Sequence, residues 1–95
     1  MSAITIDLVD SRKTIKLTGD INSIYSNRYV LRYLKDFFYP TFENDCVKIP
    51  IRESPPEEVI TKIRAMLKKY GFEELRSSST EQVLSDYYEQ EEKFN

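Results

Sequence analysis

The stretch "ITIDLVDSRKTIKLTGD", residues 4–20, decides the fold. Apolar residues recur at every second position in both of its halves, at Ile4, Ile6, Leu8, Ile15 and Leu17. A period of two is typical of a strand with one buried face. The break "DSRK" between the halves begins with two turn-forming residues. We therefore expect an antiparallel hairpin, and because two strands alone are marginally stable, a helix must cover one face.

The next segment is expected to be that helix. Asp20 is a suitable N-cap, and apolar residues at helical spacing follow it as far as Phe38. Pro40 disfavours helical dihedrals for the residue before it. These signals predict one continuous helix from Asp20 to about Tyr39.

A strand and a second helix follow. "CVKIPIR", residues 46–52, alternates like a strand, and Pro50 favours a position at the edge of the sheet. "SPPEEVITKIRAMLKKYGF", residues 54–72, has Ser54 as an expected N-cap and Pro55 at the first helical position. Gly71 stands where a helix commonly ends in the left-handed conformation.

The remainder of the chain is less regular. "FEELRSSS", residues 72–79, fits either a short fourth strand or a linker, and an acidic helix is expected after it. We predict a small α+β domain of order ββαβα at residues 1–76, with a linker and C-terminal helix at residues 77–95. That helix has no end signal, which favours a segment that continues into a further domain slightly over a frayed terminus.

The amino-acid composition excludes several classes of functional site. The chain has 95 residues, a net charge of −2, one cysteine, no histidine and two glycines. These counts exclude an internal disulfide, histidine-based catalysis and a phosphate loop that is rich in glycine, and they leave no plausible zinc site. No apolar run approaches the length of a membrane span. We expect a cytoplasmic, non-catalytic protein without cofactor, metal or membrane contact.

One helical stripe suggests a binding surface. On a helical wheel, the basic residues of "SNRYVLRYLKDFFYP", residues 26–40, fall on one line with two tyrosines. The predicted nucleic-acid-binding residues are this stripe and two cations of the hairpin turn: Arg12, Lys13, Tyr25, Arg28, Arg32, Lys35 and Tyr39. Cations neutralise phosphates, and tyrosine rings stack on unpaired bases. The alternative is an ordinary helix flank whose cations remain in water.

Charge is distributed unevenly along the chain. Twelve basic and nine acidic residues precede Glu73, whereas two basic and seven acidic residues occur from Glu73 onward. A basic body with an acidic tail favours nucleic acid as the partner. The alternative function is a stand-alone protein-interaction module, such as a phage protein that docks on a host factor through Tyr87, Tyr88 and Phe94 of the last helix.

The string "TIKLTGD…LRYLKDFFYP…CVKIPI…VITKIRAMLKKYGFEE" resembles the small N-terminal domain that precedes the motor of superfamily 2 DNA helicases of the UvsW type, in phages and bacteria. The trailing "YYEQEEKFN" resembles the acidic helix that leads into such a motor. The segment "TFENDCVK" stands where that domain has an aromatic and glycine-rich stretch, so no individual residue is carried over. The resemblance implies an accessory domain that contacts nucleic acid, with DNA ahead of RNA, or positions an adjoining helicase motor.

Overall fold

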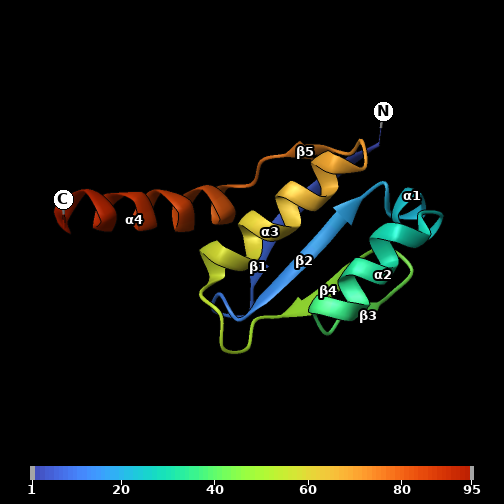
Figure 1. The fold of residues 1–95 in the computed structure, drawn as a ribbon, viewed down its shortest axis with the longest axis horizontal. Coiled ribbons are helices and arrows are strands. Elements are labelled where there is room, and N and C mark those ends of the chain that lie inside the picture. The colour runs from blue at the N-terminus through green and yellow to red at the C-terminus, as the bar shows by residue number, and fades with distance from the viewer. Residues whose placement is uncertain (1, 95) are drawn as a thin grey trace.

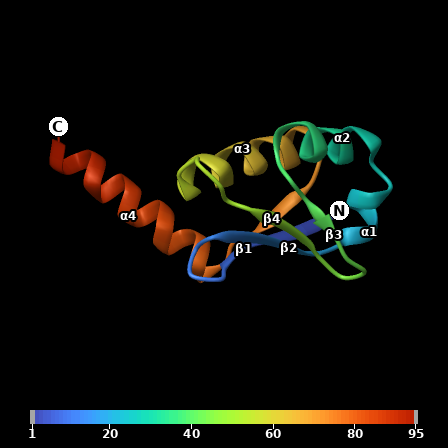
Figure 2. The same cartoon turned by 90° about the horizontal axis from the view of Figure 1, so that it is seen from below.

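The computed structural model describes the backbone of residues 2–94 and the side chains of residues 2–86. A five-stranded sheet carries α2 and α3 on one face (Figures 1 and 2). The elements are β1 (Ala3–Val9), β2 (Thr14–Gly19), α1 (Ile21–Tyr25), α2 (Arg28–Phe37), β3 (Thr41–Phe42), β4 (Val47–Pro50), α3 (Pro56–Lys69), β5 (Glu73–Leu75) and α4 (Ser78–Phe94). The strand order is β3-β4-β2-β1-β5. This arrangement confirms the predicted α+β class.

The hairpin is present as expected. β1 and β2 pair antiparallel, with Ile6 opposite Leu17 and Leu8 opposite Ile15. These four side chains are buried beneath the helices, so the period-two pattern defines the core face of the sheet. The turn between the strands has three consecutive residues at positive φ, from Asp10 to Arg12.

The expected single helix is wrong, because the chain breaks into α1 and α2. Asn27 has extended dihedrals, and its side chain accepts hydrogen bonds from the amides of Tyr29 (3.1 Å) and Val30 (3.2 Å). Asparagine is a far better N-cap than an interior helical residue, so it starts a new helix. The expected cap Asp20 forms no cap bond to the backbone and instead accepts from the Ser23 hydroxyl.

β4 confirms the strand predicted at residues 46–52, but it does not lie at the edge of the sheet, because β3, a strand that was not predicted, lies outside it. β4 pairs with β2 along its length, while the two residues of β3 reach only Val47 and Lys48. Within the described residues, Pro50 therefore has a strand only on its β2 side, and no strand lies beside it on the β3 side. That position suits a residue without an amide hydrogen. α3 begins one residue later than expected, after Pro55, and Ser54 forms no cap bond. Gly71 ends it at φ 85°.

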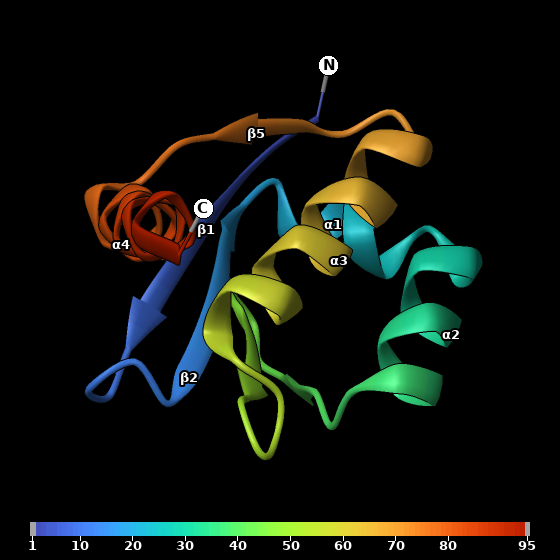
Figure 3. The same cartoon turned by 60° about the vertical axis from the view of Figure 1, so that its left-hand side comes forward.

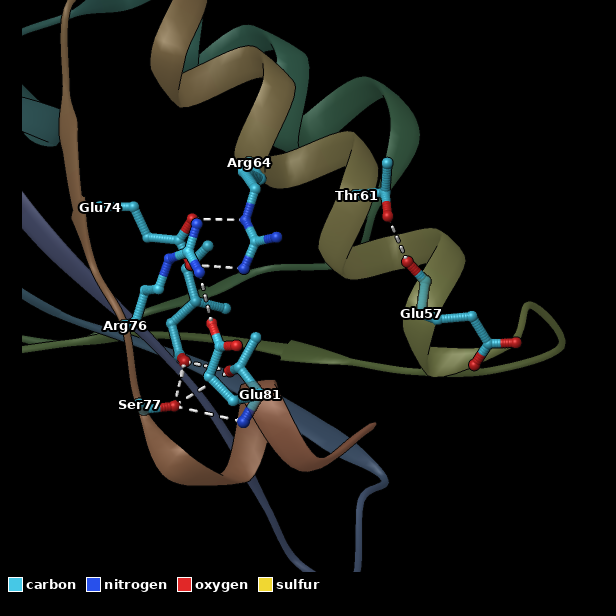
Figure 4. A network of polar contacts seen from close by, with 9 residues as sticks. Glu57, Thr61, Arg64, Glu74, Arg76, Ser77 and Glu81 are labelled. Carbon is cyan, nitrogen blue, oxygen red and sulfur yellow. Dashed lines mark hydrogen bonds and ion pairs between the residues drawn. The ribbon is translucent and has the colours of Figure 1, made fainter. Parts of the chain in front are cut away.

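Part of the segment 72–79, which fitted either a strand or a linker, forms the strand β5. It pairs parallel with the first half of β1, with Ala3 opposite Glu73. The Arg64 guanidinium of α3 forms two hydrogen bonds with the Glu74 carboxylate of β5, one of them 2.9 Å long (Figure 4). This pair is mostly shielded from solvent and joins the helix layer to the edge strand.

The expected linker at residues 77–79 is instead a point of attachment. β5 pairs only as far as Thr5, which leaves the outer edge of β1 unpaired beyond it. The Ser77 hydroxyl donates to the carbonyl of Ile6 (2.7 Å), and so does the fully buried Thr80 hydroxyl. The Leu8 amide donates to the Ser79 hydroxyl (3.0 Å). Hydroxyl groups thus replace a neighbouring strand.

α4 begins inside the domain and ends outside it. Val83 and Leu84 are buried in the same core as the sheet, so the folded unit extends past the expected boundary at residue 76. The rest of α4 projects beyond the sheet (Figures 1 and 2) and gives the molecule extents of 43 × 26 × 20 Å. Among the described residues, no helix has both the length and the apolar character needed to cross a bilayer.

Candidate nucleic-acid interface

Three predicted cations share one exposed face of α2. Arg28, Arg32 and Lys35 are spaced by four and three residues, and all three are exposed. On the opposite side of the helix, Val30 and Leu34 are fully buried in the core. We call these three cationic side chains the basic row.

Neighbouring aromatic rings support the basic row. The Arg28 guanidinium lies 5.3 Å from the centre of the Tyr29 ring, and the Lys35 ammonium lies 5.6 Å from that of Phe42. Both separations suit cation–π attraction. Phe42 belongs to β3, so this short strand helps to position a side chain of α2.

Arg32 has an acidic neighbour on its own helix. Its Nε lies 3.6 Å from the Asp36 carboxylate, one turn later. Both side chains are mostly exposed, and exposed pairs of this kind contribute at most about 1 kcal/mol. Such a pair opens readily, so Arg32 can still contact a phosphate.

Tyr25 does not join the basic row, because it lies on α1. Its hydroxyl donates to the carbonyls of Glu43 and Cys46, the latter at 3.2 Å. Its ring meets Phe42 edge-on, with the ring centres 5.8 Å apart. Burial raises the pKa of the Tyr25 hydroxyl. Tyr25 therefore holds the β3–β4 turn in place and does not offer a free ring face.

The same turn contains the single cysteine of the chain. The buried Cys46 thiol donates to the Glu43 carboxylate (2.9 Å). This bond is the main cause that lowers the pKa of Glu43 and raises the pKa of Cys46, and Lys48 lowers that of Glu43 further. These contacts stabilise the turn between β3 and β4, so the contact between Cys46 and Glu43 has a structural role.

Tyr39 is exposed, as the binding hypothesis requires, but it lies beyond the end of α2. Its side chain is 64% exposed. The Arg52 guanidinium lies over its ring at 4.1 Å from the ring centre. The two residues come from segments on either side of β3 and β4, so their contact is a product of the tertiary fold.

The two turn cations are not continuous with the basic row. Arg12 lies 3.6 Å from the Asp86 carboxylate of α4. The Lys13 side chain is exposed, and its carbonyl accepts from the Ile51 amide (2.8 Å). The hairpin turn is therefore tied to α4 and to the end of β4, whereas the row lies on α2.

A half-open pocket lies between α2 and α3, which run side by side (Figures 1 and 3). Its volume is about 510 Å³. It is lined by Tyr33, Phe37, Phe38, Tyr39, Pro50, Arg52, Glu53, Ser54, Val59 and Lys62. Of these, the sequence prediction included only Tyr39. The string "FFYP" was the available signal, since several adjacent aromatic residues at a helix end cannot all be buried.

The aromatic side chains of this region pack on one another. The ring centres of Tyr33 and Phe37 are 4.9 Å apart, and those of Tyr33 and Phe38 are 6.1 Å apart. Further along the helix pair, Tyr29 of α2 stacks on Tyr70, with ring planes 4° from parallel. An aromatic seam therefore runs along the α2–α3 boundary.

The predicted partner-binding side chains Tyr87, Tyr88 and Phe94 lie outside the residues whose side chains the structure describes. Within the described part, no group of three or more Cys, Asp or Glu side chains is placed to hold a metal ion. Comparisons with protein-family models, curated proteins and solved structures gave no match to this chain.

Proposed function

We propose that this chain is a non-catalytic nucleic-acid-binding accessory domain that contacts phosphates through the basic row. The observation that carries the proposal is an exposed face of α2 with Arg28, Arg32 and Lys35 in line. The exposed ring of Tyr29 (57%) lies on the same helix, beside the Arg28 guanidinium. Cations beside exposed rings suit a ligand with phosphates and aromatic bases.

The distribution of charge supports the same function. The acidic residues after Phe72 belong mainly to β5 and α4, and α4 lies on the other side of α3 from α2 (Figure 3). The molecule is therefore electrically asymmetric despite its small net charge. An asymmetric field orients a polyanion toward the basic side and away from α4.

The resemblance to helicase N-terminal domains supports a finer proposal. In that role the domain would hold DNA close to the motor of a superfamily 2 helicase, and α4 would lead toward it. Binding would depend little on sequence, because phosphate contacts position a protein without reading base edges.

The test is fluorescence anisotropy of labelled DNA at several salt concentrations. Replacing Arg28→Ala together with Arg32→Ala should weaken binding similarly for all sequences. It should also reduce the slope of log affinity against log salt by about two, because each of these arginines neutralises one phosphate. Both side chains are exposed, so the fold should persist.

The matched control removes two exposed cations elsewhere, Lys68→Ala with Arg76→Ala. Lys68 lies one turn after Arg64, which faces β5, and Arg76 pairs with Glu81. The control should retain nearly all affinity. Equal losses in both double variants would assign binding to net charge alone, and unchanged affinity in the Arg28 and Arg32 variant would refute the basic row.

A protein-interaction module is the second candidate. It is favoured by the length of α4 that extends past the sheet (Figure 1). Removing residues 87–95 should then abolish capture of the protein partner while nucleic-acid affinity stays constant. Partner capture by the shortened chain would exclude the end of α4 as the docking element.

A further inference from the structure

We infer that the pocket between α2 and α3 receives one unpaired base, so that the ligand of this surface is a single-stranded nucleic acid and not a duplex. The inference rests on the proposed function and specifies its ligand. It is carried by a different set of residues from the basic row, namely the pocket lining.

The pocket has the size and surface of a site for a flat aromatic group. Its volume of about 510 Å³ lies within the range of roughly 300–1,000 Å³ typical of small-ligand sites. Tyr33, Phe37, Phe38 and Tyr39 contribute rings, and Val59 of α3 adds an apolar side chain. Phe37 and Tyr39 are 67% and 64% exposed. Arg52 covers one face of Tyr39, so a base can stack on Phe37 and on the other face of Tyr39.

The charges at the pocket match a nucleotide. Arg52 and Lys62 both line it. Arg52 lies over Tyr39, and Lys62 is paired with Glu58 at 3.0 Å on an exposed part of α3. A base stacked beside Phe37 would leave its phosphate near these two cations. Glu53 is the one acidic side chain in the lining, so it should oppose an anionic ligand.

Stacking on rings selects the strand state. In a duplex each base is already stacked and paired, and extruding it costs a few kcal/mol. In a single strand the base faces are accessible, and every base has one, so stacking tolerates any sequence. The cations that line the pocket are Arg52 and Lys62, whereas the basic row lies on the opposite side of α2 from Phe37.

The experiment compares a labelled oligothymidylate about 12 nucleotides long with a duplex of the same length, using the full chain. We expect the single strand to bind about tenfold more tightly or better. Phe37→Ala and Tyr39→Ala should each weaken binding of the single strand by about tenfold, which removes most of this preference. Duplex affinity should stay unchanged. Glu53→Gln should strengthen binding of the single strand.

Leu75→Ala is the matched control, because Leu75 is also an exposed apolar residue (49%) but lies on β5. It should change neither affinity. Circular dichroism of each variant would show that the fold is retained. A 2-aminopurine base within the strand should lose fluorescence on binding, and Phe37→Ala should restore it.

The outcomes separate the two proposals. Equal affinity for single strand and duplex, unaffected by Phe37→Ala, would overturn the pocket inference and leave the proposed function intact. Absence of binding to either DNA at low salt would overturn both. Concentration-dependent dimers in sedimentation that Phe37→Ala abolishes would show a second copy in the pocket and would also overturn the inference.

Discussion

Gly19 ends β2 directly opposite Ile4, and its backbone has φ 108°. A Cβ atom at this position would lie 2.5 Å from the carbonyl oxygen of Ala3. That oxygen accepts the amide of Asp20 at 3.0 Å, so it cannot move away without loss of the bond. Glycine is thus required here both by the dihedral angle and by the lack of space.

Replacing Gly19→Ala should therefore lower the free energy of unfolding by about 3 kcal/mol or more. Gly71→Ala is the matched control, since φ is 85° there but no atom lies within 4 Å of an added Cβ. It should cost only about 1–2 kcal/mol, which is the strain of the left-handed conformation. Urea unfolding measures both losses. Equal losses would show that the contact with Ala3 is unimportant.

At the scale of the element, the segment from Ser77 to Thr80 acts as a substitute strand. β1 is longer than β5, so an exposed backbone edge would remain after Thr5. An exposed edge is a site for pairing with another chain. Three hydroxyl groups cover it, and the Ser77 hydroxyl also accepts the Thr80 amide at 3.3 Å (Figure 4). The start of α4 thereby protects the edge of the sheet.

Thr80→Val tests this role, because it keeps the shape of the side chain and removes the hydroxyl. Thr80 is fully buried, so we expect a loss of about 1–2 kcal/mol in the free energy of unfolding. Thr61→Val is the control, since the Thr61 hydroxyl donates to the Glu57 carbonyl (2.7 Å) on an exposed face of α3 (Figure 4). It should cost less than about 0.5 kcal/mol.

Hydrogen exchange gives an independent measure of the same attachment. The Leu8 amide, which donates to Ser79, should exchange faster in the Thr80→Val chain because the edge opens more often. Unchanged exchange at Leu8, together with a stability equal to that of Thr61→Val, would contradict the substitute-strand interpretation.

At the scale of the whole molecule, the first turns of α4 contribute to the stability of the fold, whereas the rest of the helix is expected not to. Its first turns bury Val83 and Leu84 in the common core, and each such side chain contributes about 1.5–3 kcal/mol. A chain that ends at Arg76 should therefore be largely unfolded at room temperature, because small domains have little stability to lose. A chain that ends at Asp86 keeps these contacts and should fold, as circular dichroism with thermal unfolding would show. Cooperative unfolding of the shorter chain near the parent temperature would refute this division.

The candidate site was only partly predictable from the sequence. Helical periodicity within α2 correctly places Arg28, Arg32 and Lys35 on one exposed face. The same periodicity fails for Tyr25 and Tyr39, because the helix begins after Asn27 and ends at Phe37. Periodicity cannot cross a break in the helix, so residues on either side of one lose their common face.

Local signals in the sequence determined the hairpin, the third long strand and the core of α3, because alternation, turn residues and helix ends act over a few neighbouring positions. Tertiary structure decided the rest. The pairing of β5 with β1, the attachment of residues 77–80 to the edge of β1, and the approach of Arg52 to Tyr39 all join segments far apart in the chain. Each of these contacts depends on which edges and surfaces remain unpaired after the sheet and helices have packed. A short stretch of sequence does not contain that information.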